Sequence, residues 1–246
     1  MQFIPFDLYV YQANLVGVAL LPISVIAAII VLTLHQFATA YIAVRCGDLT
    51  PKINGRLTIN PLRHFDMIGL ILFAFTGFGW SRHLPINPNN FKKLKTGLIL
   101  TSIAGIVFHI LTAFMLFPLY FLTTNLLPIN FFSVQLSGLL WFLIVYSVAF
   151  AVFNLIPLPP LAGWRLIDIL AKKRGKIFQF IKYNGTTILY CLIGYHFIIS
   201  TLLQYNLKIG LYLSYFDVLG YIRNMLVNGI LYPIQKLWGL VFSLWR

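Results

Sequence analysis

The residues with the clearest capacity for chemistry lie near the end of a long apolar run, in the stretch Leu34-His35-Gln36-Phe37-Ala38-Thr39. Its frame is that of His-Glu-x-x-His, in which two histidines share one helix face and bind zinc while the glutamate acts as general base. Here Gln36 occupies the position of the base, and Thr39 that of the second ligand. The chain contains no glutamate, so no glutamate elsewhere can replace that base.

The elements that position this stretch are apolar helices. Sixty percent of the residues are hydrophobic and only 9% are charged, whereas soluble domains carry about 25% charged residues. Runs of about 20 nearly uncharged residues recur, which is long enough to cross a hydrocarbon core of about 30 Å. We predict an all-α polytopic membrane protein, a bundle of about five to six apolar segments.

The predicted segments differ in length and continuity. Residues 67–80 are too short for an ordinary spanning helix, and we expect a short or partly re-entrant segment there. Residues 57–59 are predicted to form a short interfacial strand or hairpin. We divide the chain into a membrane core, 1–182, and a C-terminal extension, 183–246. The other apolar segments are 15–45, 97–123, 132–156, 186–203 and 209–245, the last broken near 223–229 and at Pro233.

The net charge of +13 comes from basic residues in the loops between apolar runs. No nucleic-acid motif accompanies them, so we expect no nucleic-acid partner. We expect these loops to face the cytoplasm and to contact anionic lipids. The loops at 82–95 and 165–182 are separated by two spans and share a side. The loop at 45–63 is also basic; either it shares that side because 67–80 does not fully cross, or the positive-inside rule fails locally. His35 and the turn at 157–163 then meet near the cytoplasmic face.

Further stretches strengthen the pattern around His35. They are Gly55-Arg56-Leu57-Thr58-Ile59-Asn60-Pro61, Gly77-Phe78-Gly79-Trp80 with 85–91, Ala104-Gly105, and Phe153-Asn154-Leu155-Ile156-Pro157-Leu158-Pro159-Pro160-Leu161. In this order, over about residues 15 to 170, the chain resembles the site-2 protease family of intramembrane zinc metalloproteases, in particular its compact bacterial branch. The resemblance implies a site-2-protease-like helical bundle in a bacterial inner membrane.

The chain departs from this family at the positions that carry the chemistry. In the family, two histidines and the aspartate of a Leu-Asp-Gly turn hold zinc. Here only His35 remains, while Thr39 and Ala162 replace the other two ligands and Gln36 replaces the base. His109 stands where the family has a polar, asparagine-like residue.

These departures predict a loss of catalysis. A catalytic zinc site needs three protein ligands and an open position for water. Without the metal, water keeps a pKa of about 15.7 rather than about 7. A glutamine cannot accept a proton, so general-base assistance of about 10²–10⁴-fold is also missing. We therefore predict that zinc is absent and that the chain is not an enzyme, with His35, Gln36, Thr39 and Ala162 as degenerate positions.

Three functions compete on this sequence. The first is an accessory, scaffolding or regulatory subunit that binds helices of other integral membrane proteins in a stable complex. The second is a metalloprotease with an altered metal site made by His35 and His109, helped by His64, His83 or Asp66. The third is a small transporter or channel, which the near absence of charge within the spans does not favour.

Simpler interpretations apply to several polar residues. His35 is expected to be a buried neutral histidine, hydrogen-bonded to Gln36, Thr39 or a neighbouring helix. The stretch 87–90 is expected to order its own loop through side-chain-to-backbone hydrogen bonds. His196 is expected to serve packing or to lie at the membrane interface, and Arg165 with Asp168 either to pair or to be solvated.

Overall fold

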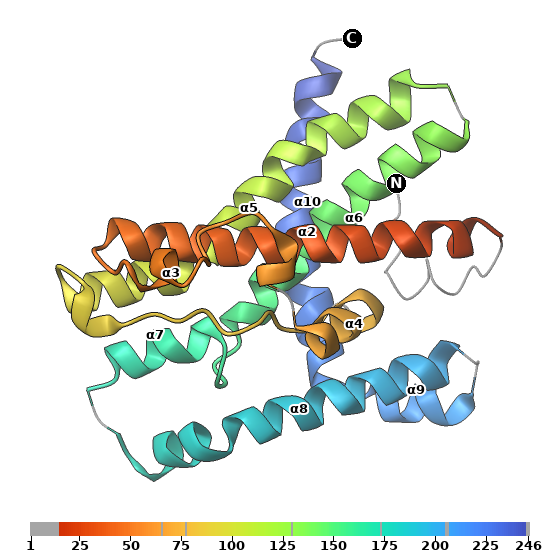
Figure 1. Ribbon diagram of the computed structural model, residues 1–246. Coiled ribbons are helices and arrows are strands. Elements are labelled where there is room, and N and C mark those ends of the chain that lie inside the picture. The colour runs from red at the N-terminus through yellow and green to blue at the C-terminus, as the bar shows by residue number, and fades with distance from the viewer. Residues whose placement is uncertain are drawn as a thin grey trace.

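The computed structural model describes residues 15–64, 66–76, 78–128, 130–172, 174–204 and 207–244. Residues 1–14 of the predicted core and Gly77 of the 77–80 motif lie outside this part of the chain. The described elements are all helical (Figure 1): α2 (Leu15–Arg45), α3 (Thr50–Ile53), η1 (Pro61–Arg63), α4 (Met67–Thr76), η2 (Pro88–Asn90), α5 (Leu94–Leu126), α6 (Phe131–Leu155), α7 (Ala162–Leu170), α8 (Lys176–Gln204), α9 (Lys208–Ser214) and α10 (Val218–Ser243).

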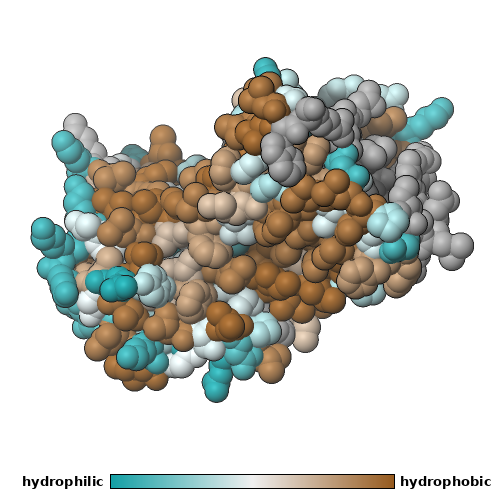
Figure 2. Space-filling model, turned by 90° about the horizontal axis from the view of Figure 1, so that it is seen from above, coloured by the Kyte–Doolittle hydropathy of each residue, from teal (hydrophilic) through white to brown (hydrophobic). Residues whose placement is uncertain are grey.

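Five of the described helices are long and apolar enough to span a membrane: α2 from Pro22, α5, α6, α8 to Leu203, and α10. Hydrophobic residues cover much of the face seen in Figure 2, and hydrophilic residues gather mainly at one end. The predicted all-α polytopic membrane architecture is therefore confirmed, and the first predicted segment, 15–45, coincides with α2.

The centre of the molecule consists of α2, α5 and α6, which pack against one another. A short turn joins α5 to α6, because Asn130 starts α6 with a capping box: its side chain accepts from the Ser133 N–H, and the Ser133 hydroxyl accepts from the Asn130 N–H. Helix α10 packs on α5 and α6, and α8 packs on α4, α9 and α10. The C-terminal helices are therefore joined to the central helices mainly through α10, which packs on α5 and α6.

The loop that follows α2 is joined directly to the loop that precedes α5. The Lys92 N–H donates to the Cys46 carbonyl at 3.0 Å. The Asp48 carboxylate accepts from the Asn87 N–H at 2.8 Å and from the Asn90 side chain at 3.0 Å. Although burial alone would raise the pKa of Asp48, its hydrogen bonds, those from Thr50, Asn90 and Asn87, lower it below the usual value.

Because these two loops are joined, the chain between them, which includes residues 67–80, must begin and end at the same end of the bundle. Helix α4 has ten residues and is only about 15 Å long, and the chain returns beside α2 to the end at which it left (Figure 1). The segment therefore does not cross the bundle, and the loops at 45–63 and 82–95 share one end. The Asn87 side chain also accepts from the Asn89 N–H, which confirms that 87–90 orders its own loop.

Three predictions about secondary structure are wrong. Residues 57 and 58 form a bend and residue 59 has no regular structure, so no strand forms there, because side chains, rather than a partner strand, fix this loop: the His64 ring contacts the Thr58 carbonyl at 2.6 Å. The break expected near 223–229 lies instead at 215–217, where Asp217 caps α10 by accepting from the Gly220 N–H at 2.9 Å. Pro233 does not interrupt α10.

The boundary that we placed between residues 182 and 183 falls inside α8, which runs without a break from Lys176 to Gln204. The division into a core and an extension stays a prediction.

Candidate active site

A cavity of about 450 Å³ lies where α2 meets the proline-rich turn after α6. This confirms the predicted meeting of the two segments. The extended stretch 79–84, which runs between α2 and α7–α8 in Figure 1, forms one side. The cavity is lined by residues of α2 (His35, Gln36, Thr39), the 79–84 stretch, α5 (Thr101, Ser102), α6 (Phe150, Phe153, Asn154), the turn and α7 (Pro160, Leu161, Ala162, Arg165) and α8 (Thr186, Leu189, Tyr190), together with Asp66.

Two histidines stand together beside this cavity, and His35 is the one that lines it. The rings of His35 and His109 have centroids 5.3 Å apart and planes 12° apart. Both rings meet the Phe150 ring edge-on. The structure thus brings together the two histidines of the altered metal site that we considered, from helices far apart in the sequence.

Three of the four ring nitrogens of these histidines have no protein partner among the described residues. The Nδ1 atom of His35 and both ring nitrogens of His109 are buried without a hydrogen bond in the described part of the chain. Leaving a buried polar group unsatisfied costs about 1–3 kcal/mol, and native proteins rarely do so without a reason such as a water, an ion or a catalytic role. The predicted hydrogen bonds from the His35 ring to Gln36 or Thr39 are not among those present.

The close approach of α2 to α5 depends on Gly105. A Cβ atom at this position would lie 2.2 Å from Cε1 and 2.3 Å from Nδ1 of His35. The absence of a side chain therefore lets the imidazole lie directly against the backbone of α5. This is a structural reason for the Ala104-Gly105 stretch noted in the sequence.

The other positions of the His-Glu-x-x-His frame have structural roles. The Gln36 amide donates to the Ser81 hydroxyl and to the Arg82 carbonyl, the latter at 3.3 Å, and so ties α2 to the 79–84 stretch. The Thr39 hydroxyl donates to the His35 carbonyl at 2.9 Å. Ala162 is buried in the cavity wall and offers no donor atom.

The additional candidates for a metal site do not join the pair. Burial lowers the pKa of His64, more than its bond to the Thr58 carbonyl raises it. Asp66 lines the cavity, but its carboxylate caps α4 by accepting from the Gly69 N–H at 3.0 Å. His83 belongs to the 79–84 stretch, which forms one side of the cavity. Within the described ranges, no group of three His, Cys, Asp or Glu residues could hold a metal ion.

The donor atoms therefore fit a zinc site only in part. Two imidazole nitrogens at about 2.0–2.1 Å from one zinc ion place their ring centres roughly 5 Å apart, which is compatible with the spacing of His35 and His109. A site with three protein ligands does not fit these residues. The spacing suits a two-imidazole site, but the rings are stacked with planes 12° apart and imidazole lone pairs lie in the ring plane, so a shared ion requires one ring to rotate.

Sequence reasoning missed two polar members of the cavity wall. Asn154 lines the cavity, and while its Nδ2 donates to the Phe150 carbonyl at 2.9 Å, no hydrogen bond to its amide oxygen is present in the described part of the chain. Arg165 also lines the cavity. It does not pair with Asp168, which lies 3.2 Å from Arg174 instead. Their signal in the sequence was slight, since each is a single polar residue beside an apolar run.

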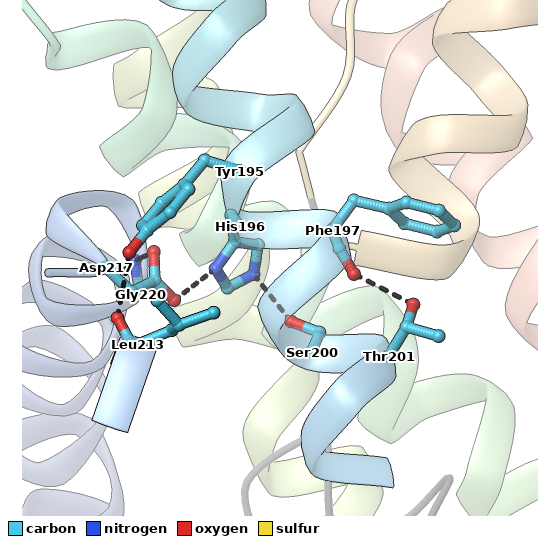
Figure 3. A network of polar contacts seen from close by, with 8 residues as sticks. All are labelled: Tyr195, His196, Phe197, Ser200, Thr201, Leu213, Asp217 and Gly220. Carbon is cyan, nitrogen blue, oxygen red and sulfur yellow. Dashed lines mark hydrogen bonds and ion pairs between the residues drawn. The ribbon is translucent and has the colours of Figure 1, made fainter. Parts of the chain in front are cut away.

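Another buried histidine lies in the C-terminal helices (Figure 3). The Nδ1 atom of His196 lies 2.6 Å from the Asp217 carboxylate, and its Nε2 lies 3.4 Å from the Ser200 hydroxyl. The ring also meets Phe78 edge-on, with centroids 4.9 Å apart. The expected packing role is therefore incomplete, because His196 also joins α8 to the start of α10.

Comparison with known proteins gives one informative relative. The chain is 39% identical over 170 residues, which are 68% of this chain and 78% of the relative, to the "putative zinc metalloprotease YwhC" of Bacillus subtilis. No protein-family model matches the chain. No solved structure matches it either.

This comparison contradicts our prediction that the chain is not an enzyme. The relative bears the name of a zinc metalloprotease, and nothing in the structure demonstrates a loss of activity. The sequence argument compared each position of one motif with a three-ligand site, and it gave too little weight to His109, which only the fold brings to His35. The comparison favours the protease alternative over the accessory-subunit interpretation.

Proposed function

This chain belongs to a family of zinc metalloproteases, and on that premise we propose that it is an intramembrane metalloprotease with an altered metal site. In this proposal His35 and His109 bind the ion, and the cavity beside them receives a segment of another integral membrane protein. The proposal keeps the site-2-protease-like arrangement of the bundle and places the cavity near the cytoplasmic side of a bacterial inner membrane.

The observation that carries the proposal is the set of three buried imidazole nitrogens for which the described residues provide no partner. A histidine that served only packing would be expected to hydrogen-bond a neighbouring group when buried. The two rings instead stand together beside a cavity whose wall includes His35. A metal ion held by both rings would satisfy nitrogens that the protein leaves unsatisfied.

The residues around the pair have distinct tasks. A zinc ion bound there supplies a Lewis acid and lowers the pKa of a bound water. Gln36 fixes the position of the 79–84 stretch through its two hydrogen bonds. Asn154 presents an acceptor oxygen that can orient a peptide N–H. Phe150 and Phe153 line the cavity and exclude water.

The surroundings support a membrane-protein substrate. Four of the helices that line the cavity, α2, α5, α6 and α8, are long and apolar enough to span a membrane. A segment that reaches the cavity must therefore pass between apolar helices. The basic loops at the same end of the bundle are suited to anionic lipid headgroups, and we propose that they hold the protein at the membrane surface.

Two measurements test the proposal on the full chain in lipid nanodiscs. Elemental analysis is expected to find zinc, and incubation with casein, an unstructured protein, is expected to yield fragments that disappear when a chelator is added. His35→Ala and His109→Ala should each remove the metal and the cleavage. Thr201→Ala, an exposed change on α8, should alter neither.

The opposite results would overturn the proposal. They are a correctly folded protein that contains no zinc after purification in zinc-supplemented buffer and leaves casein intact, or a bound metal that survives both histidine substitutions. The second outcome would place the metal elsewhere in the chain.

A further inference from the structure

Arg165 lies on the wall of the cavity, and no counter-ion for it is present among the described residues. It is half-buried, and burial lowers the pKa of its guanidinium below the usual value. No hydrogen bond or ion pair of this guanidinium is present in the part of the chain that the structure describes. A charge removed from water without a partner is costly, so a partner from outside the chain would be favoured.

The chain itself has few carboxylates to offer. It has five acidic residues, all aspartates. Those described are occupied: Asp48 binds the 87–90 loop, Asp66 caps α4, Asp168 pairs with Arg174, and Asp217 pairs with His196. The fifth, Asp7, lies outside the described residues.

A neighbouring arginine shows the contrast. Arg56 is also buried, but its guanidinium donates to the carbonyls of Arg63, Arg82 and His83. Its charge thus serves to hold the loop against the 79–84 stretch. Arg165 has no such task, and it faces a cavity rather than the backbone.

The cavity around Arg165 is electropositive. Arg82 and His83 line it as well, and Asp66 is its sole acidic lining residue. Burial lowers the pKa of His83, and the charges of Arg165 and Arg56 lower it further. His83 is therefore neutral at pH 7 and does not compete with Arg165 for an anion.

We propose that Arg165 binds a carboxylate of the substrate segment, either an acidic side chain or a free C-terminus, and so selects substrates that carry one beside the site of cleavage. This inference rests on the proposed function, because it assumes that a peptide segment enters the cavity. A guanidinium matches a carboxylate with two parallel hydrogen bonds, which are among the stronger hydrogen bonds in proteins.

The test compares two short peptides, acetylated at the N-terminus and amidated at the C-terminus, which are apolar and identical except for a central glutamate or glutamine. Binding to the full chain in phosphatidylcholine nanodiscs is measured by calorimetry with EDTA present, so that no metal ion attracts the carboxylate. The glutamate peptide should bind about ten- to a hundredfold more tightly, the range for a hydrogen bond to a charged group.

Variants assign this preference to Arg165. Arg165→Gln should abolish the preference. Arg165→Lys should retain part of it, because lysine keeps the positive charge but cannot form two parallel hydrogen bonds to one carboxylate. Arg174→Gln is the matched control, because Arg174 is exposed and pairs with Asp168; it should leave the preference intact. Lowering the pH through the ordinary glutamate pKa of about 4.3 should remove the preference as the carboxylate gains its proton.

Several outcomes would overturn the inference. They are equal binding of both peptides, failure of both to bind, a preference that survives Arg165→Gln in a folded protein, or displacement of the glutamate peptide by phosphatidylglycerol in the nanodisc, which would assign Arg165 to a lipid headgroup. Zinc-dependent cleavage of casein without a glutamate preference would remove only this inference. A preference without zinc or cleavage would remove the proposed function and leave the carboxylate site.

Discussion

Two buried histidine sites in this molecule differ in how their nitrogens are satisfied. His35 and His109 stack against each other on α2 and α5, and three of their four ring nitrogens are buried without a partner. His196 on α8 instead contacts Asp217 and Ser200 (Figure 3), and Asp217 in turn caps α10. Both sites are shielded from solvent.

The difference distinguishes a histidine bonded to neighbouring side chains from a pair whose nitrogens find few partners among the described residues. At His196, hydrogen bonds join two helices and nothing further is needed to balance the buried polar groups. At His35 and His109, the protein bears the cost of unsatisfied nitrogens beside a cavity. We expect changes at the first site to act on stability and changes at the second to act on activity.

The largest effect should follow His109→Leu. Loss of one of the two imidazoles should lower the cleavage rate at least about a hundredfold, since metal activation and general-base steps each contribute effects of that size. Stability should rise, or fall by less than about 1 kcal/mol, because two unsatisfied nitrogens disappear. Casein cleavage and thermal unfolding in detergent measure the two effects. If the free energy of unfolding fell by several kcal/mol while cleavage stayed unchanged, His109 would serve stability rather than activity.

The second effect concerns His196→Ala. Removing one partner of a buried pair leaves the other unsatisfied, so the free energy of unfolding should fall by about 2–5 kcal/mol. Asp217→Ala should cost more, because it also removes the cap of α10, worth about 1 kcal/mol. Thermal unfolding in detergent gives the order of the two variants. Cleavage per folded molecule should stay near that of the parent chain.

The third effect separates two glycines on spanning helices. Gly105→Ala should displace the His35 ring, with a cost in stability of about 1–3 kcal/mol and a loss of zinc. Gly194→Ala is the control, because no atom lies within 4 Å of its Cβ position; it should stabilise α8 by up to about 1 kcal/mol. Zinc content and unfolding temperature are the measurements. Retention of zinc in Gly105→Ala would show that His35 need not lie against α5.

The smallest effect should follow Ser200→Ala. The hydroxyl of Ser200 lies 3.4 Å from Nε2 of His196, a long contact, so the expected change in stability is within about 0.5 kcal/mol. Cleavage of casein should not change. A large loss of cleavage in a folded Ser200→Ala protein would instead assign chemistry to Ser200, His196 and Asp217 and would make the C-terminal site the active one.

Much of the fold could be predicted from apolar periodicity and length. Segment 15–45 matches α2, and the short segment at 67–80 becomes the ten-residue α4. The strand at 57–59 and the break at 223–229 were wrong, because both depended on contacts between distant residues: the His64 ring on Thr58, and Asp217 at the start of α10. Local propensity does not contain such contacts.

The sequence by itself determined that the protein lies in a membrane rather than in water. It also determined the number of long apolar helices and the absence of a three-ligand His-Glu-x-x-His site. These properties depend on composition and on residue types at fixed spacing. Only the tertiary structure decided that His109 faces His35, that Gly105 makes room for the ring, and that Arg165 lacks an anion. A side chain acquires its function from the groups around it, and the packing of α2, α5 and α7 sets those neighbours.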